Sequence, residues 1–173
     1  MNIDKLLDYF NQKNFDLIVE LLKNKNFNEE KNYKFSFLLS LSYFNLGKYE
    51  DSLRYINIAL SKEKNNSEIF FNKGIILEKL NLIDDSLVFY LKAIEINNSN
   101  VQALNNIGLI FFKRKKYFLS IKYFKLSISK DEKYWQACYN LGLLYVEIRK
   151  FKLALINFIN VRDLIPKNSN PYI

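Results

Sequence analysis

Residues 135–168 read WQACYNLGLLYVEIRKFKLALINFINVRDLIPKN, and they contain Gly142, one of only four glycines in the chain. Two others, Gly74 and Gly108, precede it with one constant spacing, and each lies in an apolar run with helical periodicity. A glycine inside a helix costs about 0.5–1 kcal/mol relative to alanine, so its regular recurrence needs a structural reason. We expect a close helix–helix contact, made once per repeat, where a Cβ atom would not fit. The 34-residue period therefore predicts a stacked series of helix pairs.

The two helices of each repeat are visible in the apolar spacing. In residues 101–134 the first stripe contains Leu104, Ile107 and Phe111, and the second contains Ile121 and Phe124. Small residues also recur on the second helix with the period of the glycines, namely Ser52, Ser86, Ser120 and Ala154. We expect these small residues to face the glycines, so that the two helices of a pair approach closely while aromatic side chains fill the space between pairs. The turns inside the pairs are short and polar: Gly47-Lys48, Asn81-Leu82, Lys115-Lys116 and Arg149-Lys150.

The repeat resembles the tetratricopeptide repeat (TPR). The segment 135–168 contains Cys138-x2-Leu141-Gly142-x2-Tyr145, then Ala154-x3-Phe158 and Pro166, and it departs from the family pattern W-x2-L-G-x2-Y…A-x3-F…P by having Cys in place of Trp. Residues 67–100 and 101–134 follow the same pattern more loosely, and residues 33–66 follow it weakly. The resemblance implies an all-α fold, a right-handed α-solenoid of stacked antiparallel helix pairs.

The same alignment predicts the organisation of the chain. Residues 1–32 form a degenerate N-terminal repeat or cap, and residues 169–173 form a tail that could be the start of a truncated further helix. The four full repeats between them are 33–66, 67–100, 101–134 and 135–168.

The composition argues against catalysis. The chain has no histidine, which removes the commonest general base and the commonest transition-metal ligand. Its one cysteine, Cys138, occupies a core position and has no histidine to activate it. We therefore predict no enzymatic activity, no catalytic residue, no bound metal, no cofactor and no small-molecule substrate. A single cysteine and the absence of a secretory signal favour a cytoplasmic protein.

The TPR resemblance implies that the first helix of each pair lines a concave groove. Asn72, Asn106 and Asn140 recur there once per repeat, and a carboxamide can pair with both the C=O and the N–H of an extended peptide backbone. The neighbouring groove positions are largely apolar. The function predicted is that of a protein-interaction scaffold, binding a peptide or an amphipathic helix of another protein through a groove that contains Phe37, Phe71, Asn72, Asn105, Asn106, Phe112, Tyr139 and Asn140.

A basic edge offers an alternative. The net charge of +8 is concentrated in residues 101–134, which carry eight Lys and Arg against two acids. Two successive turns of the stack form this edge, with Lys113, Arg114, Lys115 and Lys116 in one and Arg149, Lys150 and Lys152 in the next. Such an edge could bind an acidic protein, nucleic acid or an anionic membrane surface, or it could be no more than a solvated surface. No RNA-binding aromatic motif accompanies it, which makes nucleic acid the weaker candidate.

Two further features stand out from the pattern. Lys73 stands where the family has leucine, and we expect its ammonium to reach solvent or an acid such as Glu78 or Glu95. At the C-terminal end, Leu155, Val161 and Leu164 are expected on an uncovered apolar face. That face predicts self-association through residues 150–173.

Overall fold

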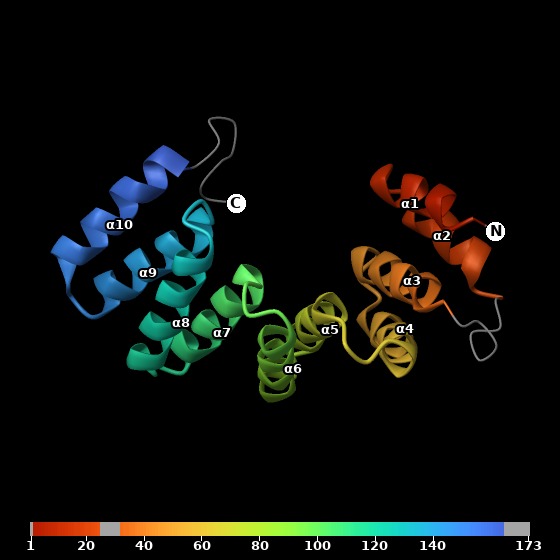
Figure 1. Ribbon diagram of the computed structural model, residues 1–173, viewed down its shortest axis with the longest axis horizontal. Helices are drawn as coiled ribbons and strands as arrows, with labels where there is room; N and C mark the ends of the chain where they lie inside the picture. The colour runs from red at the N-terminus through yellow and green to blue at the C-terminus, as the bar shows by residue number, and fades with distance from the viewer. Residues whose placement is uncertain (1, 25–31, 165–173) are drawn as a thin grey trace. The chain divides into compact units, whose positions relative to one another are not determined.

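The computed structural model describes residues 2–24 and 32–164, apart from the side chain of Asp163. Within these residues the chain forms ten α-helices and no β-strand (Figure 1). The helices are α1 (Ile3–Asn11), α2 (Phe15–Leu22), α3 (Tyr33–Asn45), α4 (Tyr49–Lys62), α5 (Ser67–Lys79), α6 (Ile83–Ile96), α7 (Val101–Lys113), α8 (Tyr117–Lys130), α9 (Trp135–Glu147) and α10 (Phe151–Leu164). The predicted tail 169–173 and Pro166 lie outside the described residues.

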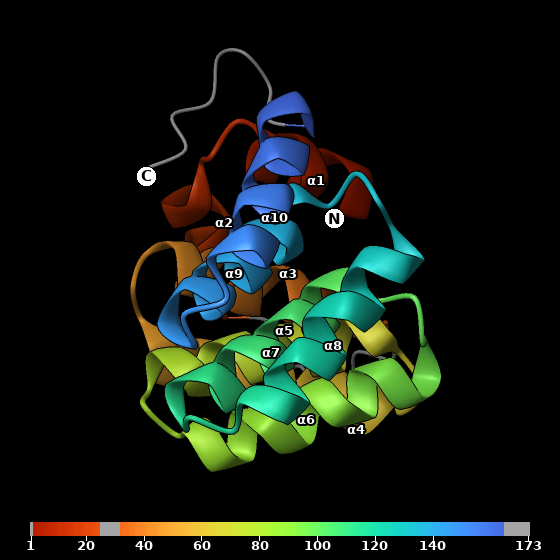
Figure 2. The same cartoon turned by 90° about the vertical axis from the view of Figure 1, so that its left-hand side faces the viewer.

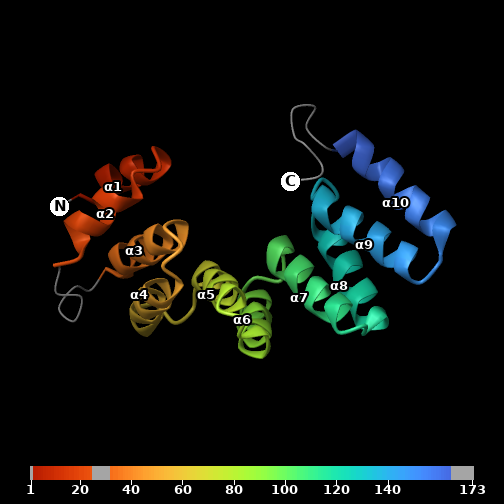
Figure 3. The same cartoon turned by 180° about the vertical axis from the view of Figure 1, so that it is seen from behind.

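The helices group into two compact units, Met1–Ile96 and Asn97–Ile173. In the first unit α3 packs against α4 and α5 against α6, and the pairs can be followed from behind in Figure 3. In the second unit α7 packs against α8 and α9 against α10 (Figure 2). Successive pairs join within a unit because the second helix of one pair contacts the first helix of the next, as α4 contacts α5 and α8 contacts α9.

An asparagine precedes the first helix of three successive pairs. Asn32, Asn66 and Asn100 are N-caps of α3, α5 and α7, and each side-chain oxygen accepts a hydrogen bond from a backbone N–H in the first turn, at 2.9–3.2 Å. These three residues occupy the same position in successive repeats. The asparagine-rich junctions therefore have a local structural cause, because an N-cap satisfies backbone donors that the helix cannot.

The turn inside each full pair is made by one residue with positive φ. Gly47 has φ 73°, and Asn81, Lys115 and Arg149 have φ 61°, 56° and 57° in turns of the same kind. Glycine and asparagine adopt this left-handed conformation readily, whereas lysine and arginine adopt it at a cost. The four predicted turns are thus confirmed, and in each of them the residue with positive φ is the first of the predicted dipeptide.

The recurring glycines mark the closest approach of each pair. A Cβ atom on Gly74 would lie 2.5 Å from the Tyr90 ring, and one on Gly108 would lie 2.6 Å from the Phe124 ring. Gly142 faces Phe158 in the same way, at 2.6 Å. The expected steric reason for the glycines is confirmed, and the atoms that exclude a Cβ belong to an aromatic ring of the second helix, which we did not predict.

The small residues contribute in another way. Ser120 donates a hydrogen bond of 2.8 Å to the carbonyl oxygen of Gly108. In the α3–α4 pair, Ser40 stands in the glycine position, and the hydroxyls of Ser40 and Ser52 each donate to the backbone carbonyl of the other residue at 2.8 Å. A small side chain on the second helix therefore lets a hydroxyl bridge the two backbones.

Candidate functional site

A hollow of about 350 Å³ opens between the first helices of the Met1–Ile96 unit. Its walls come from α1 and α3, and α5 contributes one residue. The lining residues are Ile3, Leu7, Phe10, Tyr33, Lys34, Phe37, Leu38, Leu41 and Glu68. This volume is within the range of small-ligand sites and is large enough for an apolar side chain of a partner.

Helical spacing explains why these residues converge. Ile3, Leu7 and Phe10 follow one another at steps of four and then three positions, which places them on one face of α1. On α3, Lys34, Phe37 and Leu41 share a face by the same kind of spacing. Leu7 remains 44% exposed, so the hollow presents apolar surface to solvent.

Two residues of opposite charge stand among the apolar ones. Lys34 and Glu68 are both exposed, and they occupy equivalent positions in successive repeats, each being the second residue of its helix. The hollow therefore combines an apolar surface with one cation and one anion, an arrangement suited to an apolar side chain and the polar backbone around it.

The predicted groove residues of this unit differ in their roles. Phe37 lines the hollow. Phe71 packs on Tyr90, with ring centroids 5.9 Å apart, and Asn72 donates from Nδ2 to the carbonyl oxygen of Glu68 at 2.9 Å. The three residues of α1 were missed by the sequence-based interpretation, because residues 1–32 depart too far from the repeat for the groove positions to be assigned there.

In the Asn97–Ile173 unit, two of the predicted carboxamides bind each other. Asn140 donates from Nδ2 to Oδ1 of Asn105 at 2.9 Å, and Asn105 is only 4% exposed. Asn105 therefore lies inside the α7–α9 contact, although we placed it on the groove surface. Asn106 and Asn140 are partly exposed.

The aromatic residues predicted for the same unit are packed within it. Phe112 contacts Tyr117, with ring centroids 6.3 Å apart. Tyr139 contacts Trp135 and Phe158 at 6.5 and 5.8 Å. All are half-buried, so they hold α7 and α9 in place as well as facing solvent. A peptide-binding role for these residues stays a prediction.

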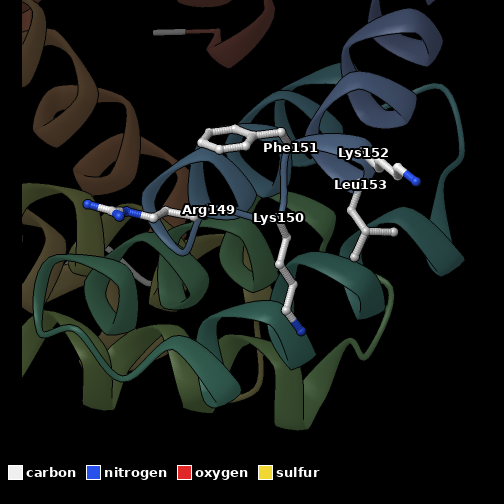
Figure 4. Close-up of a pocket in the computed structure, with 5 residues that line it drawn as sticks. All are labelled: Arg149, Lys150, Phe151, Lys152 and Leu153. Atoms are coloured by element: carbon white, nitrogen blue, oxygen red, sulfur yellow. The ribbon is translucent and has the colours of Figure 1, made fainter.

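The basic edge is exposed. Lys113, Lys115, Lys116, Arg149, Lys150 and Lys152 are exposed, and Arg114 is partly exposed. A hollow of about 550 Å³ is lined by Arg149, Lys150, Phe151, Lys152 and Leu153 (Figure 4). The side chains of Arg149 and Lys152 extend in opposite directions in that view, and Phe151 is 62% exposed. The edge therefore joins positive charge to an exposed aromatic ring.

Lys73 has a different partner from the ones we expected. Its Nζ lies 4.0 Å from the centroid of the Phe89 ring, and Glu78 accepts a hydrogen bond from Tyr90 at 3.0 Å. Burial, and then the charge of Lys92, lower the pKa of Lys73, while the charge of Asp85 opposes them. The side chain is a half-buried cation on an aromatic face, and both the ring and the charge of Asp85 favour the ammonium.

The cysteine and the acidic residues of the described chain can be located in the structure. Cys138 is buried, and burial raises the pKa of its thiol, which disfavours the reactive thiolate. Among the residues that the structure describes, no group of three or more His, Cys, Asp or Glu could hold a metal ion. None of the described helices has the length and apolar character needed to cross a bilayer.

Comparisons with known proteins identify the repeat and the fold. The family model described as "Tetratricopeptide repeat" matches residues 67–100, the same bounds as one predicted repeat. Among curated proteins, none has a sequence that matches this chain.

Several solved structures match the chain over most of its length. MamA is 17% identical, with 95% of each chain covered and a TM-score of 0.79. The C-terminal part of a TPR repeat-containing protein from Cytophaga hutchinsonii is 21% identical, with 95% of this chain and 65% of that chain covered and a TM-score of 0.82. PilF of Pseudomonas aeruginosa is 15% identical, with 96% of this chain and 76% of that chain covered and a TM-score of 0.82. At these identities the likeness concerns the fold alone.

Proposed function

Residues 67–100 are a tetratricopeptide repeat in a chain with the all-α fold of TPR proteins, and we propose that this chain is a non-enzymatic scaffold that binds a segment of another protein. A repeat fold of this kind is built for protein–protein interaction, since its successive first helices offer an extended surface. We also propose the division into one degenerate and four full repeats. The single buried cysteine suits a reducing compartment such as the cytoplasm.

The observation that carries the proposal is the hollow between α1, α3 and α5. Apolar side chains of Leu7, Phe37 and Leu41 surround about 350 Å³ of space, and Leu7 is 44% exposed. An apolar anchor of the partner, such as a leucine or phenylalanine side chain, would fill this space. Burying such a side chain contributes about 1.5–3 kcal/mol, enough to dominate the affinity of a short segment.

The two charged residues that line the hollow, Lys34 and Glu68, would then orient the bound segment. The ammonium of Lys34 can bind a backbone carbonyl and the carboxylate of Glu68 a backbone N–H, on either side of the anchor. The ligand class that fits is an extended peptide or one turn of an amphipathic helix with a large apolar residue. This corresponds to recognition through an anchor in a groove.

A charge placed in the hollow tests the proposal. A random 12-residue peptide library is selected against the wild type, against Leu7→Glu and against Leu17→Glu. Leu17 is 36% exposed on α2 and does not line the hollow, so it is the matched control. We expect enrichment of peptides with a large apolar anchor on the wild type and on Leu17→Glu, with affinity reduced at least about ten-fold for Leu7→Glu. Equal binding to Leu7→Glu would contradict the proposal.

A second test concerns the carboxamides. Asn106→Ala with Asn140→Ala should weaken the selected peptides at any salt concentration if these side chains pair with peptide backbone. Because Asn140 also binds Asn105, the thermal unfolding of the double variant is measured alongside. Peptide affinity equal to that of the wild type would remove the carboxamides from the binding surface.

The basic edge carries the second candidate function, binding of an acidic protein segment. It is favoured by the hollow beside Phe151, where exposed cations flank an exposed ring. Lys115→Glu with Lys116→Glu should weaken an acidic partner, whose affinity for the wild type falls steeply with ionic strength. An affinity that is insensitive to salt would exclude this function.

A further inference from the structure

The second helix of the α7–α8 pair is covered by α9. Tyr117 and Ile121 on α8, together with Leu109 and Phe112 on α7, pack against a cluster that contains Leu141, Leu144 and Tyr145 of α9. The hydroxyl of Tyr117 donates to Oε1 of Glu147 at 3.3 Å, which fixes where the C-terminal end of the covering helix lies. This contact defines how one helix sits on a pair within the Asn97–Ile173 unit.

Among the residues that the structure describes, none covers the corresponding face of the α9–α10 pair, whose apolar side chains are exposed. The residues one repeat later than those on α7 and α8 are Leu143, Val146, Phe151 and Leu155, and they are 38%, 43%, 62% and 60% exposed. Ile156 and Ile159 on α10 are also 55% and 44% exposed, but they correspond to Lys122 and Lys125 of α8, which are exposed to solvent in the preceding pair. We call Leu143, Val146, Phe151 and Leu155 the α9–α10 end face. Contiguous exposed apolar side chains of this size indicate an interaction surface.

We propose that the α9–α10 end face binds an amphipathic α-helix of another protein, which lies on it as α9 lies on α7 and α8. The repeat argues for this occupant, because the equivalents of these four residues on the preceding pair already contact a helix, although Ile128 in that contact is replaced by Arg162 on the end face. On α9 the contacting residues are Leu141, Leu144, Tyr145 and Ile148. The partner helix therefore presents apolar residues at i, i+3, i+4 and i+7.

Charge defines the partner further. In the existing contact, Glu147 of the covering helix lies over Tyr117, and the residue equivalent to Tyr117 on the end face is Phe151. Phe151 is preceded by Arg149 and Lys150 and followed by Lys152, and all three are exposed. The three side chains extend in different directions (Figure 4), so an acid at the position of Glu147 in the partner helix would lie beside a positively charged turn and not in a pocket formed by three cations. The partner is a helix with an acidic C-terminal end.

The same charges argue against a second copy of this chain as the occupant. Two copies joined through their end faces would each bring the exposed cations Arg149, Lys150 and Lys152 to the interface. Like charges at an interface oppose association. The self-association that the sequence predicts is therefore an alternative that the experiment must distinguish.

The test uses two stapled 18-residue peptides as probes. The acidic peptide carries Leu, Leu, Tyr, Glu and Ile at the spacing of Leu141, Leu144, Tyr145, Glu147 and Ile148, with further Glu at its C-terminal end. The basic peptide has Lys in place of every Glu. Fluorescence anisotropy is measured with the full chain, with Leu155→Glu, and with Val88→Glu. Val88 is 47% exposed on α6 and is the matched control.

We expect the acidic peptide to bind the wild type and Val88→Glu equally, and Leu155→Glu at least about ten-fold more weakly. The basic peptide should bind the wild type at least about ten-fold more weakly than the acidic one. Lys150→Glu with Lys152→Glu should remove this preference. Leu7→Glu should leave the affinity unchanged, so this result is independent of the hollow between α1, α3 and α5.

Three results would overturn the proposal. The first is equal binding of the acidic peptide to the wild type and Leu155→Glu. The second is a concentration-dependent dimer in sedimentation velocity that Leu155→Glu dissociates, which would identify a second copy as the occupant. The third is tighter peptide binding after removal of residues 165–173, which would identify the C-terminal segment of the chain itself.

Discussion

The pairs α3–α4 and α5–α6 bring their helices together with different side chains. In α5–α6, Gly74 faces the ring of Tyr90, and a Cβ atom there would lie 2.5 Å from the ring. In α3–α4 the corresponding residues are Ser40 and Ile56, both fully buried. Where the second helix carries a ring, the first helix has no side chain; where it carries the smaller isoleucine, the first helix has a hydroxymethyl group.

The difference shows that two positions on opposite helices of a pair share one volume. A packed interior tolerates little change in volume, so a larger residue at one position requires a smaller one at the other. The serine in α3–α4 adds what glycine cannot, because the Ser40 and Ser52 hydroxyls bond both backbones across the pair. The family pattern of glycine facing an aromatic residue is therefore one of two solutions in this chain.

Removing a ring from a glycine–ring contact should have the largest effect. Phe124 is fully buried against Gly108, and the glycine has no side chain that could fill the space. Phe124→Ala should lower the free energy of unfolding by about 3–5 kcal/mol, measured by urea denaturation and circular dichroism. Phe118, which is 82% exposed, is the control, and Phe118→Ala should change stability by less than about 0.5 kcal/mol. A similar small change for Phe124→Ala would show that the ring position is not part of the core.

Adding a Cβ atom tests the shared volume directly. Gly74→Ala should destabilise by about 1–3 kcal/mol, because the buried Tyr90 ring must move. In the background of Tyr90→Ile, which copies Ser40 facing Ile56, the same substitution should become neutral or stabilise by up to about 1 kcal/mol, since alanine is the better helix former. A double-mutant cycle measures the difference. An equal loss of stability in both backgrounds would show that residues 74 and 90 do not share one volume.

The serine bridge should contribute less than the ring. Ser40→Ala removes one hydroxyl and leaves the buried Ser52 carbonyl without that donor, which should cost about 1–2 kcal/mol of unfolding free energy. Ser129 makes a 2.8 Å hydrogen bond to the backbone of its own helix at an exposed position. Ser129→Ala is the control and should be nearly neutral. If both variants lose the same stability, the bridge has no special role.

The smallest effect concerns Lys73, whose counterpart in α3 is the buried Leu39. Burial lowers the pKa of Lys73 below its ordinary value of 10.5. Between the lowered pKa and 10.5 the unfolded chain binds more protons at this residue than the folded chain. The stability of the wild type relative to Lys73→Met should therefore rise with pH in that window. Urea denaturation at neutral and alkaline pH measures it, and a stability difference that falls with rising pH would contradict the assignment.

Much of the fold followed from residue spacing. The regular recurrence of Gly74, Gly108 and Gly142 indicates paired helices, and the polar dipeptides locate the turns, because both depend on local chemistry that sequence shows directly. The partner of each glycine was harder to predict. Helical spacing says which residues share a face, but the residue met across the pair depends on how the two helices are aligned.

The candidate site was predicted less well, for the same reason. Phe37 was recognised as a groove residue, whereas Leu7 and Phe10 lie in a segment too far from the repeat to align. Asn105 and Asn140 have the same residue type as Asn106, and spacing alone could not tell that the first two bind each other. For Lys73, an acid seemed the natural partner, but the nearest favourable surface is the Phe89 ring.

The glycine–ring contact also bears on how such a chain can change over generations. Both members of each contact, such as Gly108 and Phe124, belong to the same helix pair. Duplication or deletion of one whole repeat therefore adds or removes the glycine and its ring together. Adding or removing whole repeats should therefore disturb the packing less than a boundary that falls inside a repeat, which would separate the ring of that pair from its glycine.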